Sequence, residues 1–169
     1  MRNILFAVAA AAILAVSCEP EQSELNMSSI KNQAKIVGTV KYNSGTVKND
    51  DASFTENVML KASGAEVVAR IAYSSYGGGS GNYVVKTTTN ANGDYTLTVP
   101  VGNSSINVTV ECLPFYKTKN VKDDENNIQP ISKALYNIFT YNPAGGAVSL
   151  ASEQIKTVNI EATSSATLE

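Results

Sequence analysis

Apolar and polar residues alternate along several short segments of this chain. In the clearest case Ile106, Val108, Val110 and Cys112 all fall on one face of an extended backbone. A period of two is what a half-buried β-strand requires, because successive side chains point to opposite faces of a sheet. Segments rich in Gly, Asn, Pro or Asp separate the runs, and no repeat of fixed period is visible. The pattern therefore predicts an all-β fold.

The alternating runs predict about seven short strands, an arrangement typical of an antiparallel β-sandwich. The strands are expected over residues 34–42, 64–74, 83–89, 95–99, 105–112, 147–150 and 154–161, with a further short one over 58–62. Residues 131–141 suit a strand or a helix, and we favour a strand because the neighbouring segments are strands. Residues 43–56 and 113–129 are expected to be irregular, the latter with a charged tip.

Residues 83–89 and 95–99 carry the strongest local signal. Both runs are rich in β-branched and aromatic residues, and the loop of residues 90–94 between them contains an Asn-Gly pair. Asn-Gly favours the positive φ angles of a tight turn, so we expect the two runs to form a hairpin. In the second run, Tyr95, Leu97 and Val99 are expected to share one face, with Thr96 and Thr98 on the other.

The N-terminus has the pattern of a secretory signal. Arg2 precedes an apolar run over residues 4–15, and small residues follow it. This run is too short to cross a bilayer as a helix. The segment Ala15-Val16-Ser17-Cys18 resembles the lipobox of bacterial lipoproteins, although Ala15 stands where Leu is commonest.

The lipobox resemblance implies three regions. Residues 1–17 would be the signal peptide that is removed, and Cys18 would carry the acyl chains that anchor the protein in a membrane. Residues 18–33 would form a flexible tether, since they show no sustained apolar period, and residues 34–169 would form a single sandwich domain.

The segment that follows Cys18, residues 19–24, is acidic. It resembles the surface-export signal of Bacteroides-type lipoproteins, which implies an outer-membrane lipoprotein displayed at the cell surface. A solvated acidic linker is the alternative interpretation, and the periplasmic face is the alternative location.

Charge and composition exclude several classes of function. The leader holds one of the 13 basic residues and none of the 15 acidic ones, which leaves a mature net charge of about −3 and argues against nucleic acid as a partner. The chain has no His, the commonest general base, and no Trp. If Cys18 is lipidated, Cys112 has no disulfide partner, and its place in an alternating run predicts a buried apolar role.

Four short motifs occur in order along the predicted domain. They read KIVGTV at 35–40, GAEV at 64–67, TTTNANGDYTL at 87–97 and VPVG at 99–102. This order resembles the carboxypeptidase regulatory-like domain, a transthyretin-like (prealbumin-like) β-sandwich, over about residues 34–118. The chain departs from the family where LPFY at 113–116 replaces a Gly-Tyr pair. The resemblance implies a Greek-key sandwich that serves as an accessory module rather than an enzyme.

Neither an active site nor a metal or cofactor site is expected. Residues 90–94 and 123–127 carry clustered oxygen ligands, but their spacing does not match a known calcium loop. No base is available to activate a Ser or Thr, although a hydrolase that uses only carboxylates remains an alternative. An internal Lys–Asn isopeptide bond, as in related adhesins, would need Lys35 or Lys41 with Asn159 and Glu111, and the strand pattern leaves Asn159 and Glu111 on exposed faces.

The remaining expectation is a binding or scaffolding function outside the cell. The partner would be a protein or a glycan, with the membrane contacted through the lipid anchor. A carbohydrate-binding module would use exposed tyrosines such as Tyr73, Tyr76 or Tyr83 as stacking surfaces. An adhesin or fimbrial structural subunit is the other alternative.

Overall fold

The computed structural model describes residues 26–167, and Cys18, the leader and the first part of the tether lie outside the described residues. The strands are β1 (Gln33–Asn43), β2 (Val47–Lys48), β3 (Phe54–Thr55), β4 (Met59–Lys61), β5 (Glu66–Ala72), β6 (Asn82–Thr88), β7 (Asp94–Pro100), β8 (Ile106–Cys112), β9 (Phe115–Lys122), β10 (Ile128–Tyr136), β11 (Ile138–Asn142), β12 (Ala147–Leu150), β13 (Ile155–Thr157) and β14 (Asn159–Thr163). Short 3-10 turns are η1 (Met27–Ser29), η2 (Tyr73–Tyr76) and η3 (Ala144–Gly146). Among residues 26–167, no helix has the length and hydropathy needed to cross a membrane.

The all-β sandwich that the alternation predicts is confirmed, and strands rather than a helix occupy residues 131–141. The number of strands is different. Fourteen occur within the described residues, rather than about seven. One expected strand divides at Val158 into β13 and β14, and the segments expected to be irregular contain β2, β3 and β9.

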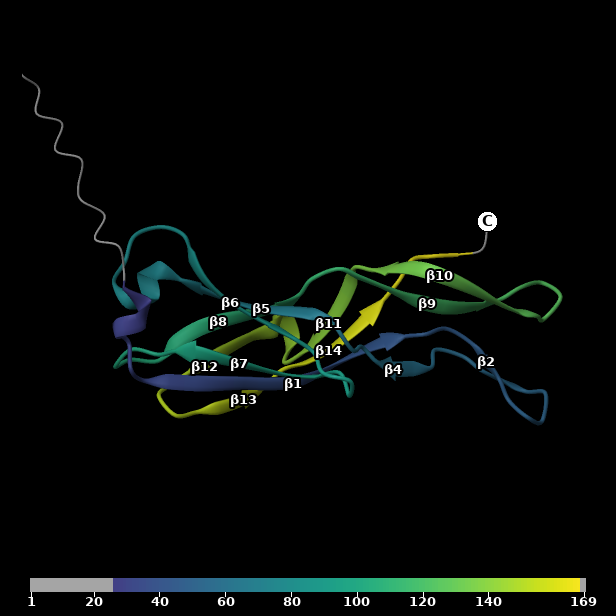
Figure 1. The fold of residues 1–169 in the computed structure, drawn as a ribbon, viewed down its shortest axis with the longest axis horizontal. Helices are drawn as coiled ribbons and strands as arrows, with labels where there is room; N and C mark the ends of the chain where they lie inside the picture. Colours follow the sequence, from purple (N-terminus) through teal and green to yellow (C-terminus); the bar gives the residue numbers. More distant parts are fainter. Residues whose placement is uncertain (1–25, 168–169) are drawn as a thin grey trace, which may run out of the picture.

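Two sheets run along the length of an elongated molecule (Figure 1). The first is built around β1, which pairs antiparallel with β7 and β4 on one side and parallel with β13 and β14 on the other. Strand β11 continues this sheet beyond β14. The second sheet has the order β12-β8-β5-β6 and is antiparallel throughout. The sandwich is thus antiparallel except along one side of β1.

The main core lies between the inward faces of these sheets. In β7 and β8 alternate residues are buried there, as the sequence pattern predicts. The largest of these fully buried side chains include Ile36 and Val40 of β1, Val67 and Ile71 of β5, Leu97 and Val99 of β7, and Val108 of β8. Removing this apolar surface from water is the dominant stabilising contribution to the fold.

Residues 83–89 and 95–99 do not form the expected hairpin. Strand β6 pairs with β5 in the second sheet, whereas β7 pairs with β1 in the first. The loop of residues 90–94 does make a tight turn, in which the Asn90 side chain accepts from the backbone N–H groups of Asn92 and Asp94. The turn therefore connects the two sheets across the core. Local turn chemistry predicts the bend but not the strand that each arm joins.

The segment over residues 113–129 is not irregular, because residues 115–122 form β9, which pairs with β10 in a ribbon that begins at Ile128. Its alternation is hidden because lysines occupy positions on the same face as Phe115. Lys117 donates to the carbonyl oxygen of Ser63 at 2.8 Å, and Lys119 donates to backbone oxygens near the C-terminus. These half-buried lysines make the strand look polar throughout.

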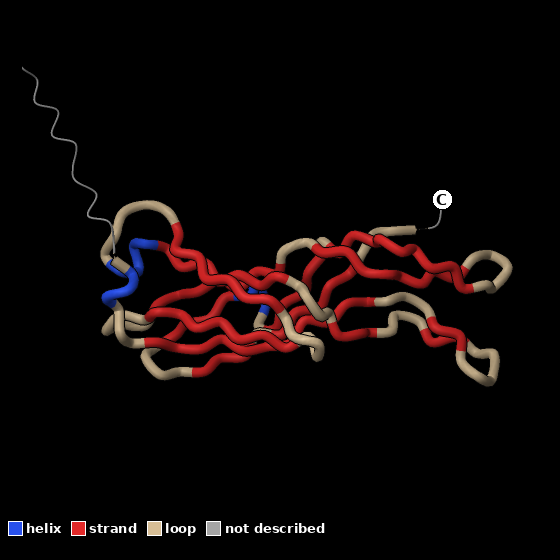
Figure 2. Tube along the Cα trace, viewed as in Figure 1, coloured by secondary structure: helices blue, strands red, loops and turns tan. Residues whose placement is uncertain are grey.

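Aromatic residues attach the β9–β10 ribbon to the end of β1. The ring of Phe115 stacks on Tyr136 with 5.5 Å between centroids, and Tyr42 meets Tyr136 edge-on at 5.2 Å. The Tyr136 hydroxyl also donates to the carbonyl oxygen of Asn43 at 2.6 Å. A second, smaller core results. The β9–β10 and β2–β3 ribbons then extend to the end of the molecule opposite η1, as Figure 2 shows.

Candidate functional site

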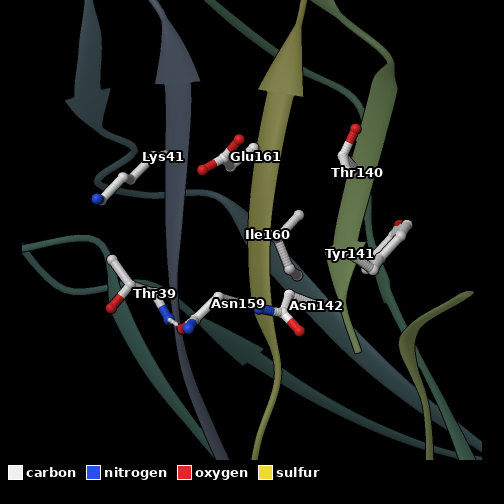
Figure 3. Close-up of a pocket in the computed structure, with 8 residues that line it drawn as sticks. All are labelled: Thr39, Lys41, Thr140, Tyr141, Asn142, Asn159, Ile160 and Glu161. Carbon is white, nitrogen blue, oxygen red and sulfur yellow. Dashed lines mark hydrogen bonds between the residues drawn. The ribbon is translucent and has the colours of Figure 1, made fainter. Parts of the chain in front are cut away.

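A polar hollow of about 380 Å³ lies on the outer face of the first sheet, over β1, β14 and β11 (Figure 3). We call it the polar hollow throughout. Its lining residues are Thr39, Lys41, Thr140, Tyr141, Asn142, Asn159, Ile160 and Glu161. Most of these residues carry polar side chains, so the hollow can form hydrogen bonds to a polar ligand.

Strand alternation places the polar residues on this face. On β1, Val40 points into the core, so its neighbour Lys41 points outward. On β14, Ile160 is buried, which turns Asn159 and Glu161 outward. The same rule puts Thr140 of β11 on the outer side. A rigid sheet, rather than a loop, therefore carries the side chains of the hollow.

A row of side chains crosses the sheet through the hollow. Lys41 lies opposite Lys61 of β4 on one side and beside Glu161 of β14 on the other, and Glu161 in turn pairs in register with Thr140. All four residues are exposed. Within residues 26–167 the ion pairs are Arg70–Glu111 and Lys86–Glu66, so neither lysine of this row is neutralised by a carboxylate.

Asn159 is held in place at the lower end of the hollow. Its side-chain oxygen accepts from the backbone N–H of Thr39 at 3.1 Å, as the dashed line in Figure 3 marks. The Thr39 hydroxyl in turn donates to Asp94 of β7 at 2.9 Å. This bonding leaves the amide nitrogen of Asn159 as a fixed donor. The hollow thus offers donors at Asn159 and Lys41 and an acceptor at Glu161.

Acidic and cysteine side chains bind metal ions where several of them cluster. Within residues 26–167, no group of three or more Asp, Glu, Cys or His side chains is arranged to hold a metal ion. Asp51 and Asp123 lie in the turns of the two projecting ribbons, where hydrogen bonds from Ser53 and from Asn127 lower the pKa of the respective carboxyl. These carboxylates stabilise their own turns.

The three tyrosines expected to contact a ligand lie near one another at the end of the molecule that carries η2, but they are half-buried. Tyr76 donates to the carbonyl oxygen of Pro100 at 2.7 Å, and burial, with a smaller contribution from Tyr83, raises its pKa to about 12. Tyr76 and Tyr83 pack against the main core. The ring of Tyr73 lies against Gly81. Each of the three rings therefore presents only part of its surface to solvent.

The residues considered for an isopeptide bond do not meet. Glu111 belongs to β8 in the second sheet, where its carboxylate binds Arg70 at 2.6 Å. Lys41 and Asn159 share the polar hollow, but both are exposed and Asn159 is bonded to Thr39. Lys35 is exposed further along β1. This separation agrees with the expectation that these are surface residues of half-buried strands.

Cys112 is buried, as its place in the alternating run predicts. Burial raises the pKa of its thiol to about 12, so the reactive thiolate is scarce at neutral pH. Its backbone N–H donates a hydrogen bond to the hydroxyl oxygen of Tyr141 at 3.3 Å. The residue therefore contributes packing to the core.

Sequence reasoning did not identify the hollow as a site. It considered Lys41 and Asn159 only for an isopeptide bond, and it did not select Glu161, Thr140 or Lys61. Their outward orientation could be predicted from the alternation of their strands. Their proximity could not, because it depends on the pairing of β4, β1, β14 and β11, which are far apart in the chain.

Comparisons with known proteins add little. No protein-family model matches the chain, and no curated protein matches it. Among solved structures, the crystal structure of the major plantain pollen allergen Pla l 1 is similar to this chain, with 13% sequence identity and a TM-score of 0.41. The match covers 81% of this chain and 98% of the allergen chain. A likeness at this score supports no inference about function.

Proposed function

We propose that the protein is a non-enzymatic, lipid-anchored binding module of the outer membrane, displayed at the cell surface, and that the polar hollow is its ligand site. One observation supports the binding role. The polar hollow has outward-pointing side chains that can donate or accept hydrogen bonds but have no protein partner in the described part of the chain, and they are carried by a rigid sheet. The side chains of Lys41, Glu161 and Asn142 make no hydrogen bond or ion pair within residues 26–167. The sheet fixes the backbone positions from which these groups project, so binding a ligand does not require the backbone to be ordered.

The lipid anchor rests on the N-terminal sequence. The lipobox-like segment ending at Cys18 supports attachment of acyl chains, and the acidic segment after it supports surface display. The described domain begins at η1, at one end of its long axis, and the strands of the hollow lie further along that axis (Figure 1). A tether joined at that end would leave the hollow open to solvent.

The binding role is tested by filling the hollow. Thr140→Trp places a bulky side chain in it, and Ser149→Trp makes the same kind of change at an exposed position of β12 in the other sheet. Both variants and the wild type, purified as full mature proteins in detergent, are tested on an array of neutral and acidic glycans. The proposal expects binding by the wild type and by Ser149→Trp, and loss of binding in Thr140→Trp. Equal binding by all three proteins, or none by the wild type, overturns it.

The anchor is tested separately with Cys18→Ser. Metabolic labelling with a palmitate analogue is expected to mark the wild type and not the variant, and the variant is expected to leave the membrane fraction. Protease treatment of intact cells then tests display, because only a surface protein is cleaved. An unlabelled wild-type protein would contradict the anchor, and protection from protease would place the protein on the periplasmic side.

A further inference from the structure

The lysines at the edge of the polar hollow form an unusual pair. Lys41 of β1 and Lys61 of β4 lie directly opposite each other in an antiparallel pairing. Like charges in this position destabilise a sheet. The ammonium group of Lys41 extends toward the β4 side of the strand and away from Glu161 (Figure 3). No ion pair relieves either lysine within residues 26–167.

In the second sheet, by contrast, charged side chains form ion pairs. On its outer face Arg70 binds Glu111 at 2.6 Å, and Lys86 binds Glu66 at 3.1 Å. Both of these pairs join neighbouring strands, and they flank Val68, which is buried between them. Opposite charges are therefore matched on the outer face of this sheet. Lys41 and Lys61, beside the hollow, instead lie opposite each other as like charges, on a chain whose formal net charge is −2.

We propose that the hollow binds an acidic oligosaccharide whose anionic group is held between Lys41 and Lys61. This inference rests on the proposed binding function and names its ligand class. A carboxylate or sulfate on a sugar would neutralise the lysine pair and remove its repulsion. Each lysine is exposed, so the anion can reach both ammonium groups from solvent.

The rest of the row selects for hydroxyl groups. Glu161 lies on the other side of Lys41, and its carboxylate has no hydrogen-bond partner within the described residues. Its carboxylate repels a second anion but accepts hydrogen bonds from hydroxyls. The amide groups of Asn142 and Asn159 supply donors nearby. A small inorganic anion would use only the lysines, whereas a sugar with one charge and several hydroxyls would use the whole row.

An apolar residue borders the same surface. Ile138 lies two positions before Thr140 on β11, so the two side chains share the outer face, and Ile138 is 53% exposed. Sugar rings present C–H groups as well as hydroxyls, and an exposed aliphatic side chain beside polar ones can contact those C–H groups. This edge of the hollow favours an oligosaccharide over a free ion.

The test measures binding of three probes to the full mature protein at low salt. The probes are an oligogalacturonate, a sulfated heparin oligosaccharide and the neutral maltoheptaose. The double variant Lys41→Gln/Lys61→Gln is expected to lose at least tenfold in affinity for an acidic probe, and Glu161→Gln to gain affinity for it because a repelling charge is removed. The charge-matched control is Lys48→Gln/Lys133→Gln, which replaces two exposed lysines of β2 and β10 outside the hollow and should bind like the wild type.

The outcomes separate this inference from the proposed function. Binding of an acidic probe that depends on both lysines supports the inference, and the preferred acidic probe shows whether the anion is a carboxylate or a sulfate. Binding of maltoheptaose that is lost in Thr140→Trp, without preference for acidic probes, keeps the function and overturns the inference. An equal loss in Lys48→Gln/Lys133→Gln would show a general charge effect and overturn it as well. Absence of binding to all three probes also overturns it.

Discussion

The hydroxyl of Tyr95 donates a hydrogen bond to the carbonyl oxygen of Val158 at 2.6 Å. Gly38 packs directly against both the Val158 carbonyl and the Tyr95 ring. Here β1 changes its parallel partner from β13 to β14, and Val158 is the residue between those two strands. Nearby, the backbone N–H of Val40 donates to the carbonyl oxygen of Gly93 at 2.8 Å. Gly38, Gly93 and Tyr95 all belong to the motifs that resemble the transthyretin-like family. Each of them makes a close contact between neighbouring strands at this point.

Gly38→Ala is expected to destabilise the protein strongly. A Cβ at this position would lie 1.9 Å from the carbonyl oxygen of Val158 and 2.9 Å from the ring of Tyr95, so two strands would have to separate. Overpacking against backbone should cost about 3 kcal/mol or more. Urea unfolding measures the loss. Gly102→Ala is the control, because no atom lies within 4 Å of its added Cβ. Similar unfolding midpoints for the two variants would contradict the prediction.

Tyr95→Phe is expected to lower the free energy of unfolding by about 1 to 2 kcal/mol, because the buried carbonyl of Val158 loses a hydrogen-bond donor. The ring itself remains, so the cost should be smaller than that of Gly38→Ala. Tyr116→Phe is the control, since Tyr116 is 63% exposed. Equal stability of Tyr95→Phe and the wild type would show that the bond contributes nothing.

Cys112 should be unreactive in the folded protein. Burial raises the pKa of its thiol to about 12, and the side chain is shielded from reagents. We expect Ellman's reagent at pH 8 to react with the native protein only as fast as it unfolds, and to react at once in urea. An engineered Ser63→Cys, at an exposed position, is the control for reagent access. Rapid labelling of native Cys112 would refute the buried role.

Stability should fall at alkaline pH. Burial is the main cause that raises the pKa values of Cys112, Tyr76 and Tyr136 to about 12, above ordinary values of 9.0 for the thiol and 10.0 for the phenols. Above pH 9 the unfolded chain therefore loses protons that the folded chain retains, and the free energy of unfolding decreases as pH rises toward 12. Urea midpoints at pH 8 and pH 11 test this. An unchanged midpoint would contradict the raised pKa values.

Lys119 should hold the C-terminal segment against the β9–β10 ribbon. Its ammonium group donates to the carbonyl oxygens of Ser164 at 2.9 Å and Ala166 at 2.7 Å. Lys119→Met is expected to cost about 1 to 2 kcal/mol and to speed amide hydrogen exchange over residues 164–167. Lys133→Met, at an exposed position of β10, should leave exchange unchanged. Equal exchange in both variants would mean that the segment is held by other contacts.

Alternation along the sequence was sufficient to predict the fold class and the orientation of individual side chains. It placed Val108, Cys112 and Val158 in the core, because burial of one face is a local property of an extended segment. It failed for β9, where Lys117 and Lys119 occupy inward positions by donating to backbone oxygens. It also failed for residues 90–94, whose tight turn is compatible with a hairpin and with a crossing between sheets.

The tertiary structure alone decided which strands are neighbours. The polar hollow exists because β1 pairs with β4 and β14, bringing Lys41 beside both Lys61 and Glu161 although 100 residues separate the last two. Strand pairing depends on the summed free energy of core packing and backbone hydrogen bonds over distant segments, which no local pattern encodes. The sequence by itself thus determined the alternating faces and the expectation of a lipid anchor at Cys18, and long-range packing determined the site.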